Sequence, residues 1–219
     1  MSIYNQARRY LLELARGQRV HGFAFVLIGG WAIWHYNPYL ESKDVDLVIR
    51  REEYWRLKEL LRALGFTETR GRLAKKGFTI KTPEGGIDVD IYDDKIGPIE
   101  AESIFQGRLW QVIKMGGEEI HVASPTILLI TKLIAAKERG LERRSAKGMK
   151  DLTDTFALLQ TQLDAVNWEV VRKHVSPESI EAVLAAALGD YSLIKRSFPT
   201  FSFTEFKGIK KRLKVEGVI

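Results

Sequence analysis

The chain has 219 residues, of which 45% are hydrophobic and 28% are charged, and its formal net charge is +6. This composition is ordinary for a globular protein that is long enough to bury a core as one domain or two small ones. The absence of cysteine excludes disulfides, zinc–thiolate sites and thiol nucleophiles. No apolar run approaches the roughly 20 residues that span a bilayer, and the first residues lack a secretory signal. We therefore expect a cytoplasmic protein with no membrane partner.

The first 123 residues alternate helical and strand patterns, which is typical of an α+β domain. Apolar residues at helical spacing predict a helix over residues 3–16, and two further helices are expected over residues 30–35 and 52–64. Gly85-Gly86 and Gly116-Gly117 indicate two β-hairpins. The predicted strands cover residues 23–28, 45–49, 78–81, 87–92, 109–114 and 119–122.

From Ser124 onward the pattern is almost entirely helical. The predicted helices cover residues 125–138, 149–159, 168–173 and 177–188. Ser124 and Ser176 are each followed by proline, and this pair is a good helix start because serine caps the helix and proline fits its first position. We expect an α+β fold with a mixed sheet and flanking helices in residues 1–123, followed by a helical C-terminal domain in residues 124–219.

Two glycines and two aspartates near the first predicted strands suggest a phosphate site beside a metal site. Gly29-Gly30 follows a buried strand, so backbone N–H groups can approach an anion closely. Asp44 and Asp46 alternate with Val45, so both carboxylates point to one face of the strand. Neighbouring carboxylates repel each other unless a cation lies between them, and hard divalent cations prefer oxygen ligands. This combination indicates nucleotide chemistry.

A second acidic pair, Asp88 and Asp90, lies on one face of the predicted strand 87–92, whose other face is apolar. A half-exposed strand with its polar residues in water explains either acidic pair alone. Two strands that each present a row of carboxylates would cost folding free energy unless these carboxylates have partners. The two pairs combined with Gly29-Gly30 therefore favour a metal site.

The order of these motifs, Gly29-Gly30, then Asp44-Val45-Asp46, then an aspartate on a later strand, resembles the nucleotidyltransferase superfamily with the polymerase-beta-like fold. The resemblance covers the front portion of the chain. Gly30 stands where many members carry serine, which removes one hydroxyl contact to phosphate. The spacer before Asp44 is also somewhat longer than is common in the family.

This resemblance implies a metal-dependent transfer of a nucleoside monophosphate from an NTP, such as ATP, to an acceptor hydroxyl. Asp44 and Asp46 would hold Mg²⁺, or Mn²⁺, with Asp90 or Asp88 as the third carboxylate and general base. We prefer Asp90 as this ligand, because Ile91-Tyr92 continues the apolar strand behind it. The implied nucleotide-binding residues in this part of the chain are Gly29, Gly30, Ser42 and Lys43.

The helical part carries a second resemblance. Lys132 in an apolar helix, then Arg139, then Lys150-Asp151-Leu152-Thr153-Asp154 is similar to AbiEii-type nucleotidyltransferases. A lysine among leucines needs a nearby anion, which would be a phosphate or a catalytic carboxylate, unless its amine extends to solvent from the edge of the core. We expect Asp151 or Asp154 to pair with Lys132 or Arg139. The resemblance implies a catalytic role for Lys132, nucleotide contacts from Lys132 and Asp154, and an antitoxin-like protein partner.

Two basic segments raise the question of the acceptor. Residues 137–150 contain six basic residues and two acidic ones, and five of the eight residues 207–214 are basic. They are either solvated surface and a basic tail or a patch for RNA, such as tRNA. Three alternatives stay open beside an RNA or protein acceptor: an aminoglycoside-type acceptor, a catalytically silent nucleotide-binding module, and a nucleic-acid-binding protein that uses its basic tail.

The remaining aromatic and histidine residues give weaker indications. Trp31 and Trp34 follow the glycine pair and either stack a base or, more commonly for such positions, pack the short helix on the sheet. The four histidines lack the spacing of a metal site and are expected to be structural or surface residues.

Overall fold

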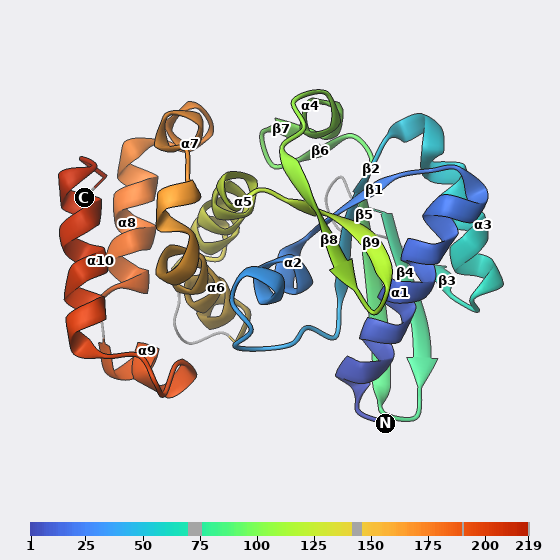
Figure 1. The fold of residues 1–219 in the computed structure, drawn as a ribbon, viewed down its shortest axis with the longest axis horizontal. Helices are drawn as coiled ribbons and strands as arrows, with labels where there is room; N and C mark the ends of the chain where they lie inside the picture. The colour runs from blue at the N-terminus through green and yellow to red at the C-terminus, as the bar shows by residue number, and fades with distance from the viewer. Residues whose placement is uncertain (70–75, 142–145, 190, 219) are drawn as a thin grey trace. The chain divides into compact units, whose positions relative to one another are not determined.

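The computed structural model describes residues 1–69, 76–141, 146–189 and 191–218 (Figure 1). Its contacts divide the chain into two compact units. The first unit comprises Met1–Trp34 and Leu40–Ser124, and the second comprises His35–Tyr39 and Pro125–Ile219. The short segment His35–Tyr39 thus belongs with the C-terminal helices, although it lies between two parts of the first unit in sequence.

The first unit is built on a seven-stranded mixed sheet with the strand order β3-β4-β5-β2-β1-β9-β8. Strand β2 runs parallel to β5, and β1 runs parallel to β9, whereas the other neighbouring pairs are antiparallel. The strands are β1 Phe25–Ile28, β2 Val45–Ile49, β3 Thr67–Thr69, β4 Lys76–Thr82, β5 Gly85–Tyr92, β8 Trp110–Met115 and β9 Glu118–Ala123. A separate two-stranded pair joins β6 Lys95–Ile96 and β7 Ile99–Glu100.

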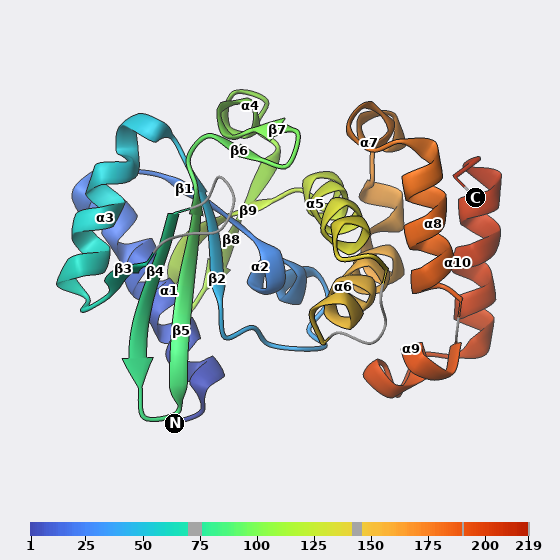
Figure 2. The ribbon, with the colours of Figure 1, turned by 180° about the vertical axis from the view of Figure 1, so that it is seen from behind.

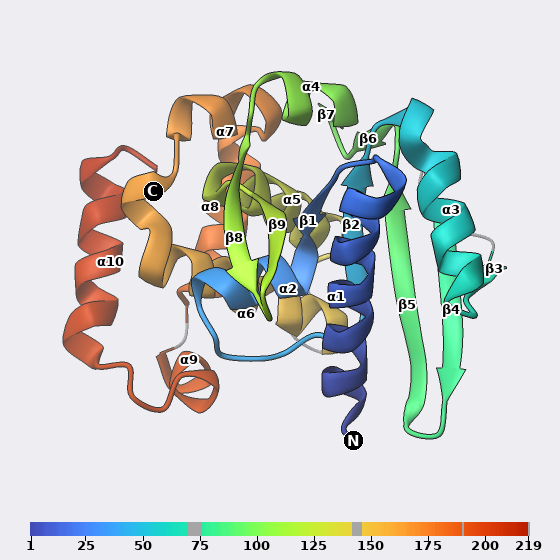
Figure 3. The ribbon, with the colours of Figure 1, turned by 45° about the vertical axis from the view of Figure 1, so that its right-hand side comes forward.

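The helices of the first unit are α1 Ile3–His21, α3 Tyr54–Ala63 and α4 Ala101–Gln106, with a 3-10 turn at Arg51–Glu53 before α3. Helix α2, Gly29–Tyr36, begins in the first unit and ends in the second. Helices α1 and α3 lie side by side along the sheet (Figures 1 and 3). They approach closely at Gly17, where an added Cβ atom would lie 2.1 Å from the side chain of Leu60.

Strand β1 is central to the sheet and supports the site described below. Its four residues, Phe25 to Ile28, are all buried, and β2 and β9 flank the strand in the sheet. Full burial of such a side chain contributes about 1.5–3 kcal/mol relative to exposure. The end of β1, and with it the position of Gly29, is therefore firmly anchored in the core.

The second unit is helical, as Figure 2 shows from behind. Its helices are α5 Pro125–Glu138, α6 Ala146–Gln162, α7 Trp168–His174, α8 Pro177–Ala187, α9 Tyr191–Ser197 and α10 Phe203–Val215, with a 3-10 turn at Leu163–Ala165. The Ser176 side chain accepts a hydrogen bond from Ser179 N, and Pro177 follows it, as expected for this helix start. Within the described ranges, every helix is too short or too polar to cross a membrane.

The expected fold class, α+β with a mixed sheet, is confirmed. The interpretation of the basic segment 207–214 as a tail is wrong. This segment lies in α10, which begins with a capping box formed by Ser202 and Glu205. The buried residues Phe206, Ile209 and Leu213 give this helix one apolar face. The expected helix 3–16 also extends to His21, because its C-cap, Gly22 with φ 64°, is the first residue that stops it.

Candidate active site

Gly29 and Asp46 are packed against each other at the end of β1. Gly29 has φ +66°, and a Cβ atom at this position would lie 2.1 Å from Asp46 Oδ2 and 2.7 Å from Asp46 Cγ. The antiparallel register places Ile28 opposite Asp46, so the carboxylate lies beside the turn into α2. Both the backbone conformation and the close approach require glycine at this position.

The register of the sheet brings a second carboxylate beside Asp46. Strands β2 and β5 are parallel neighbours, and Asp46 is paired with Asp90. Because neighbouring strands are about 4.8 Å apart, these two side chains leave the same face of the sheet at adjacent positions. Asp44, two residues before Asp46, lies in a bend immediately before β2 and not on the strand itself, as the sequence had led us to expect. All three carboxylate residues are half-buried.

Asp88 has a different environment from Asp90. It is paired with Thr79 across β4 and β5, and the Thr79 hydroxyl donates a hydrogen bond to Asp88 Oδ1. Asp90 is opposite Gly77 on that side and has Asp46 on the other. The register therefore favours Asp90 over Asp88 as the partner of Asp46.

The loop before Asp44 contains Ser42 and Lys43, for which the family resemblance implied a role in nucleotide binding. Ser42 is 6% exposed, and its hydroxyl accepts a hydrogen bond of 3.4 Å from the backbone N–H of Asp44. Lys43 is exposed. Ser42 thus helps to shape the approach to Asp44, whereas the amine of Lys43 is available to solvent.

These residues provide suitable donors for a hard divalent cation. Within residues 1–69, 76–141, 146–189 and 191–218, no group of three or more histidine, aspartate or glutamate side chains is already arranged to hold a metal ion. The donor set of Asp44, Asp46 and Asp90 nevertheless fits such an ion chemically, because Mg²⁺ prefers carboxylate oxygens and tolerates water as its other ligands. Because Gly29 has no side chain, the Asp46 carboxylate can occupy the space beside the turn.

The second unit contains a buried charged cluster around Lys132. Lys132 Nζ lies 3.1 Å from Asp151 Oδ1 and 2.6 Å from Asp154 Oδ2. The side chains of Asp151 and Asp154 are only 3% and 1% exposed, and that of Lys132 is 12% exposed. The expected pairing of Lys132 with one of these aspartates is confirmed, and it extends to both. The positive charge of Lys132, which lies among apolar side chains, is thus compensated by carboxylates of its own unit.

Three further side chains complete this cluster. Arg139 pairs with Asp151, Lys150 Nζ lies 3.2 Å from Asp154 Oδ2, and the Tyr39 hydroxyl donates a hydrogen bond to Asp154. Three cations therefore face two carboxylates, which leaves the cluster with one excess positive charge. Lys150 at i and Asp154 at i+4 are neighbours on the surface of α6, and this pair was not named from the sequence. Tyr39 had no spacing signal of this kind, because it lies in a short loop far from α6 in sequence.

The cluster shifts the pKa of two of its members. Burial acts to raise the pKa of Asp154, but the charges of Lys132 and Lys150 and the hydrogen bonds from Lys132 and Tyr39 outweigh it. The pKa of Asp154 consequently lies below the usual value for an aspartate, and the group is ionised. Burial and the negative charge of Asp154 raise the pKa of the Tyr39 hydroxyl, which stays protonated and remains a donor.

The basic residues of segment 137–150 are largely engaged in contacts within the second unit. Lys137 donates a hydrogen bond to Ser179, while Arg139 and Lys150 bind the buried aspartates. Arg143 and Arg144, which also belong to this predicted patch, lie outside the described residues. Three of the four described basic residues of this segment thus bind within the helical unit, and the fourth, Lys147, is exposed.

Of the two tryptophans near the glycine turn, Trp31 packs in the core and Trp34 is half-buried. Trp31 is fully buried and meets Trp34 edge to face, with ring centroids 5.7 Å apart. Its ring is therefore not accessible for stacking a base. The ring of His121 lies against that of Trp110, with centroids 4.1 Å apart and the ring planes tilted by 31°, and burial lowers the pKa of His121. This environment agrees with the structural role expected for the histidine.

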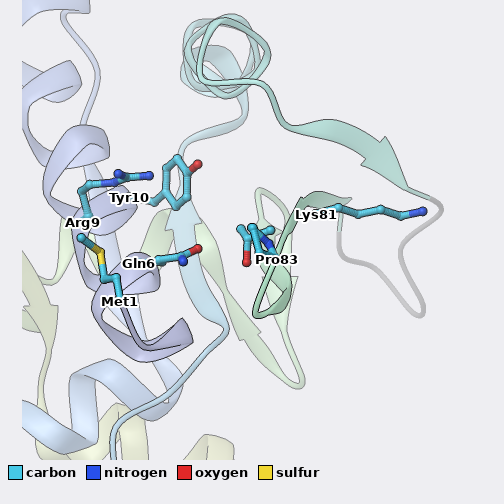
Figure 4. Close-up of a pocket in the computed structure, with 7 residues that line it drawn as sticks. Met1, Gln6, Arg9, Tyr10, Lys81 and Pro83 are labelled. Atoms are coloured by element: carbon cyan, nitrogen blue, oxygen red, sulfur yellow. The ribbon is translucent and has the colours of Figure 1, made fainter.

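A pocket of about 290 Å³ lies between α1 and the β4–β5 hairpin (Figure 4). Gln6, Arg9 and Tyr10 of α1 face Pro83 of the hairpin, and the long side chain of Lys81 points away from them (Figure 4). Gln6 donates a hydrogen bond to Glu84. None of the predicted site residues lines this pocket, so its chemistry is separate from that of the carboxylates.

Comparison with solved structures gives the fold. The structure of ANT(2'')-Ia in complex with adenylyl-2''-tobramycin is 16% identical, with a TM-score of 0.55, and the match covers 84% of this chain and 98% of that one. The solution structure of the antibiotic-resistance factor ANT(2'')-Ia is 14% identical, with a TM-score of 0.52, over 90% and 99% of the two chains. At this identity the similarity establishes a common nucleotidyltransferase fold.

A third structure, an antigenic nucleotidyltransferase-like protein from Paracoccidioides brasiliensis, has 17% identity and a TM-score of 0.49 over 86% of this chain and 97% of that one. None of the curated proteins matches the chain in sequence. A protein-family model does match it, over residues 5–190, and that family is described as an uncharacterised nucleotidyltransferase.

Proposed function

Because the chain belongs to this nucleotidyltransferase family, we propose that it transfers a nucleoside monophosphate from an NTP to an acceptor hydroxyl in a Mg²⁺-dependent reaction. The observation that carries the proposal is the packing of Asp46 on Gly29 together with the pairing of Asp46 and Asp90. The glycine turn places the Asp46 carboxylate beside that of Asp90 at the end of a buried strand. It suits a site that binds a cation and a phosphate together.

In this proposal Asp44, Asp46 and Asp90 hold the metal, and Mn²⁺ is an alternative to Mg²⁺. When bound, the metal supplies neutralisation of the triphosphate charge and lowers the pKa of the acceptor hydroxyl. Asp90 accepts the hydroxyl proton as the acceptor oxygen bonds to the α-phosphorus. The bond from the α-phosphorus to its bridging oxygen breaks, and pyrophosphate leaves. Asp88, held by Thr79, is the less favoured candidate for the third carboxylate.

The phosphates would be bound by the turn at Gly29 and Gly30. Helix α2 begins at Gly29, so its first backbone N–H groups have no partner within the helix, and the helix dipole favours an anion at this end. We assign Ser42 and Lys43 to the same nucleotide. Ser42 acts through the backbone of Asp44, and Lys43 through an exposed charge.

We assign a separate part of nucleotide binding to the charged cluster of the second unit. Lys132 and Asp154 are the members named from the sequence, and the cluster has three cations for two carboxylates. An excess positive charge complements a polyphosphate. Lys132 would contribute directly, and Asp154 would hold the lysine in place.

Two classes of acceptor are compatible with this chemistry. The first is RNA, such as tRNA, or a protein, and this class would include a toxin with an antitoxin-like partner. The second is a small molecule of the aminoglycoside type, which is supported by a specific observation: the fold is shared with ANT(2'')-Ia, whose structure contains adenylyl-2''-tobramycin.

The proposal is tested by incubating the full chain with each of four NTPs labelled at the α-phosphate, with and without Mg²⁺. Total RNA, a cell lysate and an aminoglycoside mixture serve as acceptor pools. We expect transfer of label from at least one NTP, only with the divalent cation present, and the labelled pool identifies the acceptor class. Failure to transfer label to any pool, combined with metal-dependent binding of NTP, would instead identify a catalytically silent nucleotide-binding module.

A further inference from the structure

The outward side of α10 carries four lysines in a row. Lys207, Lys210, Lys211 and Lys214 follow one another at spacings of three, one and three residues, so they form a stripe along one side of the helix. Lys207, Lys211 and Lys214 are exposed, and Lys210 is half-buried. The sequence from residue 206 to residue 215 contains no acidic residue. We refer to these four residues as the lysine stripe.

The lysine stripe has no carboxylate partner in the described part of the chain. The neighbouring Arg212, in contrast, pairs with Asp164 on another side of the helix. Like charges at three- and four-residue spacing destabilise a helix. A bound anion would offset this repulsion.

An aromatic side chain lies at one end of the lysine stripe. Phe203 is 50% exposed, its ring lies 6.1 Å from that of Phe206 in a stacked arrangement, and Lys207 Nζ lies 4.6 Å from its centre. An exposed aromatic ring beside a cation is the usual platform for an unpaired base, because every base has a face that can stack.

The helix that carries the stripe is firmly held. Its capping box closes the first turn, and Phe206, Ile209 and Leu213 are buried. At its other end, Arg172 donates hydrogen bonds to the carbonyl oxygens of Glu216 and Gly217. A helix that inserts into a membrane surface needs a free apolar face, and that of α10 is already packed in the core.

We propose that the lysine stripe binds the phosphodiester backbone of single-stranded RNA and that Phe203 stacks on one of its bases. The inference rests on the proposed function only in taking RNA as the acceptor, since RNA carries the hydroxyl groups that the reaction needs. Helix α10 lies beyond residues 5–190, which the family model matches. The stripe therefore lies outside the part of the chain that the family model matches.

Binding of the full chain to a fluorescent single-stranded RNA, followed by anisotropy over a range of salt concentrations, tests the inference. Each lysine that neutralises a phosphate contributes about 0.7 to the slope of log affinity against log salt. The triple variant K207Q/K211Q/K214Q should lower this slope by about 2 and weaken binding at least about tenfold. Phe203→Leu should weaken binding while leaving the slope unchanged.

The matched control is K81Q/K95Q/K114Q, which removes the same charge from exposed lysines of β4, β6 and β8 in the first unit. An equal loss in this control would show an effect of net charge alone and would overturn the proposal. Tighter binding to DNA of the same sequence, or to vesicles rich in anionic lipid, would overturn the choice of RNA. The assay contains no NTP, so failure of RNA binding with intact transfer of label refutes the stripe and not the proposed function.

Discussion

The carboxylate of Asp46 occupies the space into which any side chain at position 29 would project. An added Cβ atom at Gly29 would lie 2.1 Å from Asp46 Oδ2, 2.7 Å from Cγ and 2.9 Å from Cβ. Contacts below 3.0 Å are not tolerated by real Cβ atoms, so one of the two groups would have to move. Because Gly29 follows the buried strand β1, the side chain of Asp46 is the more mobile partner.

We predict that Gly29→Ala lowers nucleotidyl transfer by about 100-fold or more, because it displaces Asp46 and a misplacement of about 1 Å can have this effect on rate. The change also places alanine at φ +66°, which costs about 1–2 kcal/mol of folding free energy. Gly117→Ala is the matched control, because Gly117 has φ +86° with no atom within 4 Å of an added Cβ. It should lower stability by a similar amount while transfer persists; equal loss of transfer in both variants would refute the positional argument.

We predict different effects at the two aspartates of β5. Asp90→Asn should reduce the transfer rate by orders of magnitude, because Asp90 is paired with Asp46 across the parallel strands. Asp88→Asn should reduce it at most about tenfold, because this side chain accepts a hydrogen bond from Thr79. The rates are measured with saturating NTP and Mg²⁺, and Thr79→Val serves as a control for the local hydrogen bond. Small and equal effects at both aspartates would leave Asp90 without a catalytic role.

The sequence predicted the strands that carry the site, but it could not predict which strands pair with each other. Alternating polar and apolar residues predicted the strand at 45–49 with the observed bounds, Val45–Ile49. The register of Asp46 with Asp90 depends on β2 and β5 being parallel neighbours, although α3 and two further strands separate them in the chain. Local patterns contain no information on this order, because any strand with a similar apolar face can occupy a central position.

In the helical unit as well, the sequence predicted local elements but not contacts between residues that are distant in the chain. The helix at Pro125–Glu138 was predicted with its observed bounds, and Lys132 was recognised as a lysine that needs an anion. The hydrogen bond from Tyr39 to Asp154 joins residues that are 115 positions apart, and a loop residue carries no periodic signal for it. Helix α10 was missed because its basic residues dominate the composition, although Ser202 and Glu205 have the spacing of a capping box.

We predict that Asp154→Asn lowers the free energy of unfolding by about 3–5 kcal/mol, because it removes one partner from a buried ion pair and leaves Lys132 and Lys150 with less compensation. Asp164→Asn, at an ion pair whose carboxylate is 88% exposed, is the control and should cost less than about 1 kcal/mol. Chemical denaturation at neutral pH gives both values. Similar small losses in the two variants would show that the buried cluster adds little to stability.

The lowered pKa of Asp154 also predicts an acid limit to stability. The folded chain releases this proton more readily than the unfolded chain, whose aspartate has the ordinary pKa of 3.8. The stabilising contribution is therefore complete above pH 3.8 and is lost as the pH falls below that value. Denaturation curves from neutral pH to below pH 3.8 should show this loss in the parent and a smaller one in Asp154→Asn.

His121 predicts a second pH effect, at higher pH. Burial lowers its pKa from 6.5, so between the two pKa values the unfolded chain binds the proton and the folded chain does not. Stability should therefore be complete above pH 6.5 and should fall as the pH drops through this value. His121→Gln should reduce the slope in this range, with the remainder due to His35, whose pKa is also lowered by burial. An unchanged slope would show that His121 does not titrate differently on folding.

The most direct test of the account is the Mg²⁺-dependent release of pyrophosphate by Asp46→Asn. This substitution keeps the size of the side chain next to Gly29 and removes one carboxylate from the site, which commonly costs several kcal/mol of transition-state stabilisation. With NTP and the acceptor that the labelling experiment identifies, the parent should release pyrophosphate only when Mg²⁺ is added. Asp46→Asn should release almost none while its unfolding curve remains close to that of the parent. Release by Asp46→Asn at the parent rate would contradict the assignment of the active site.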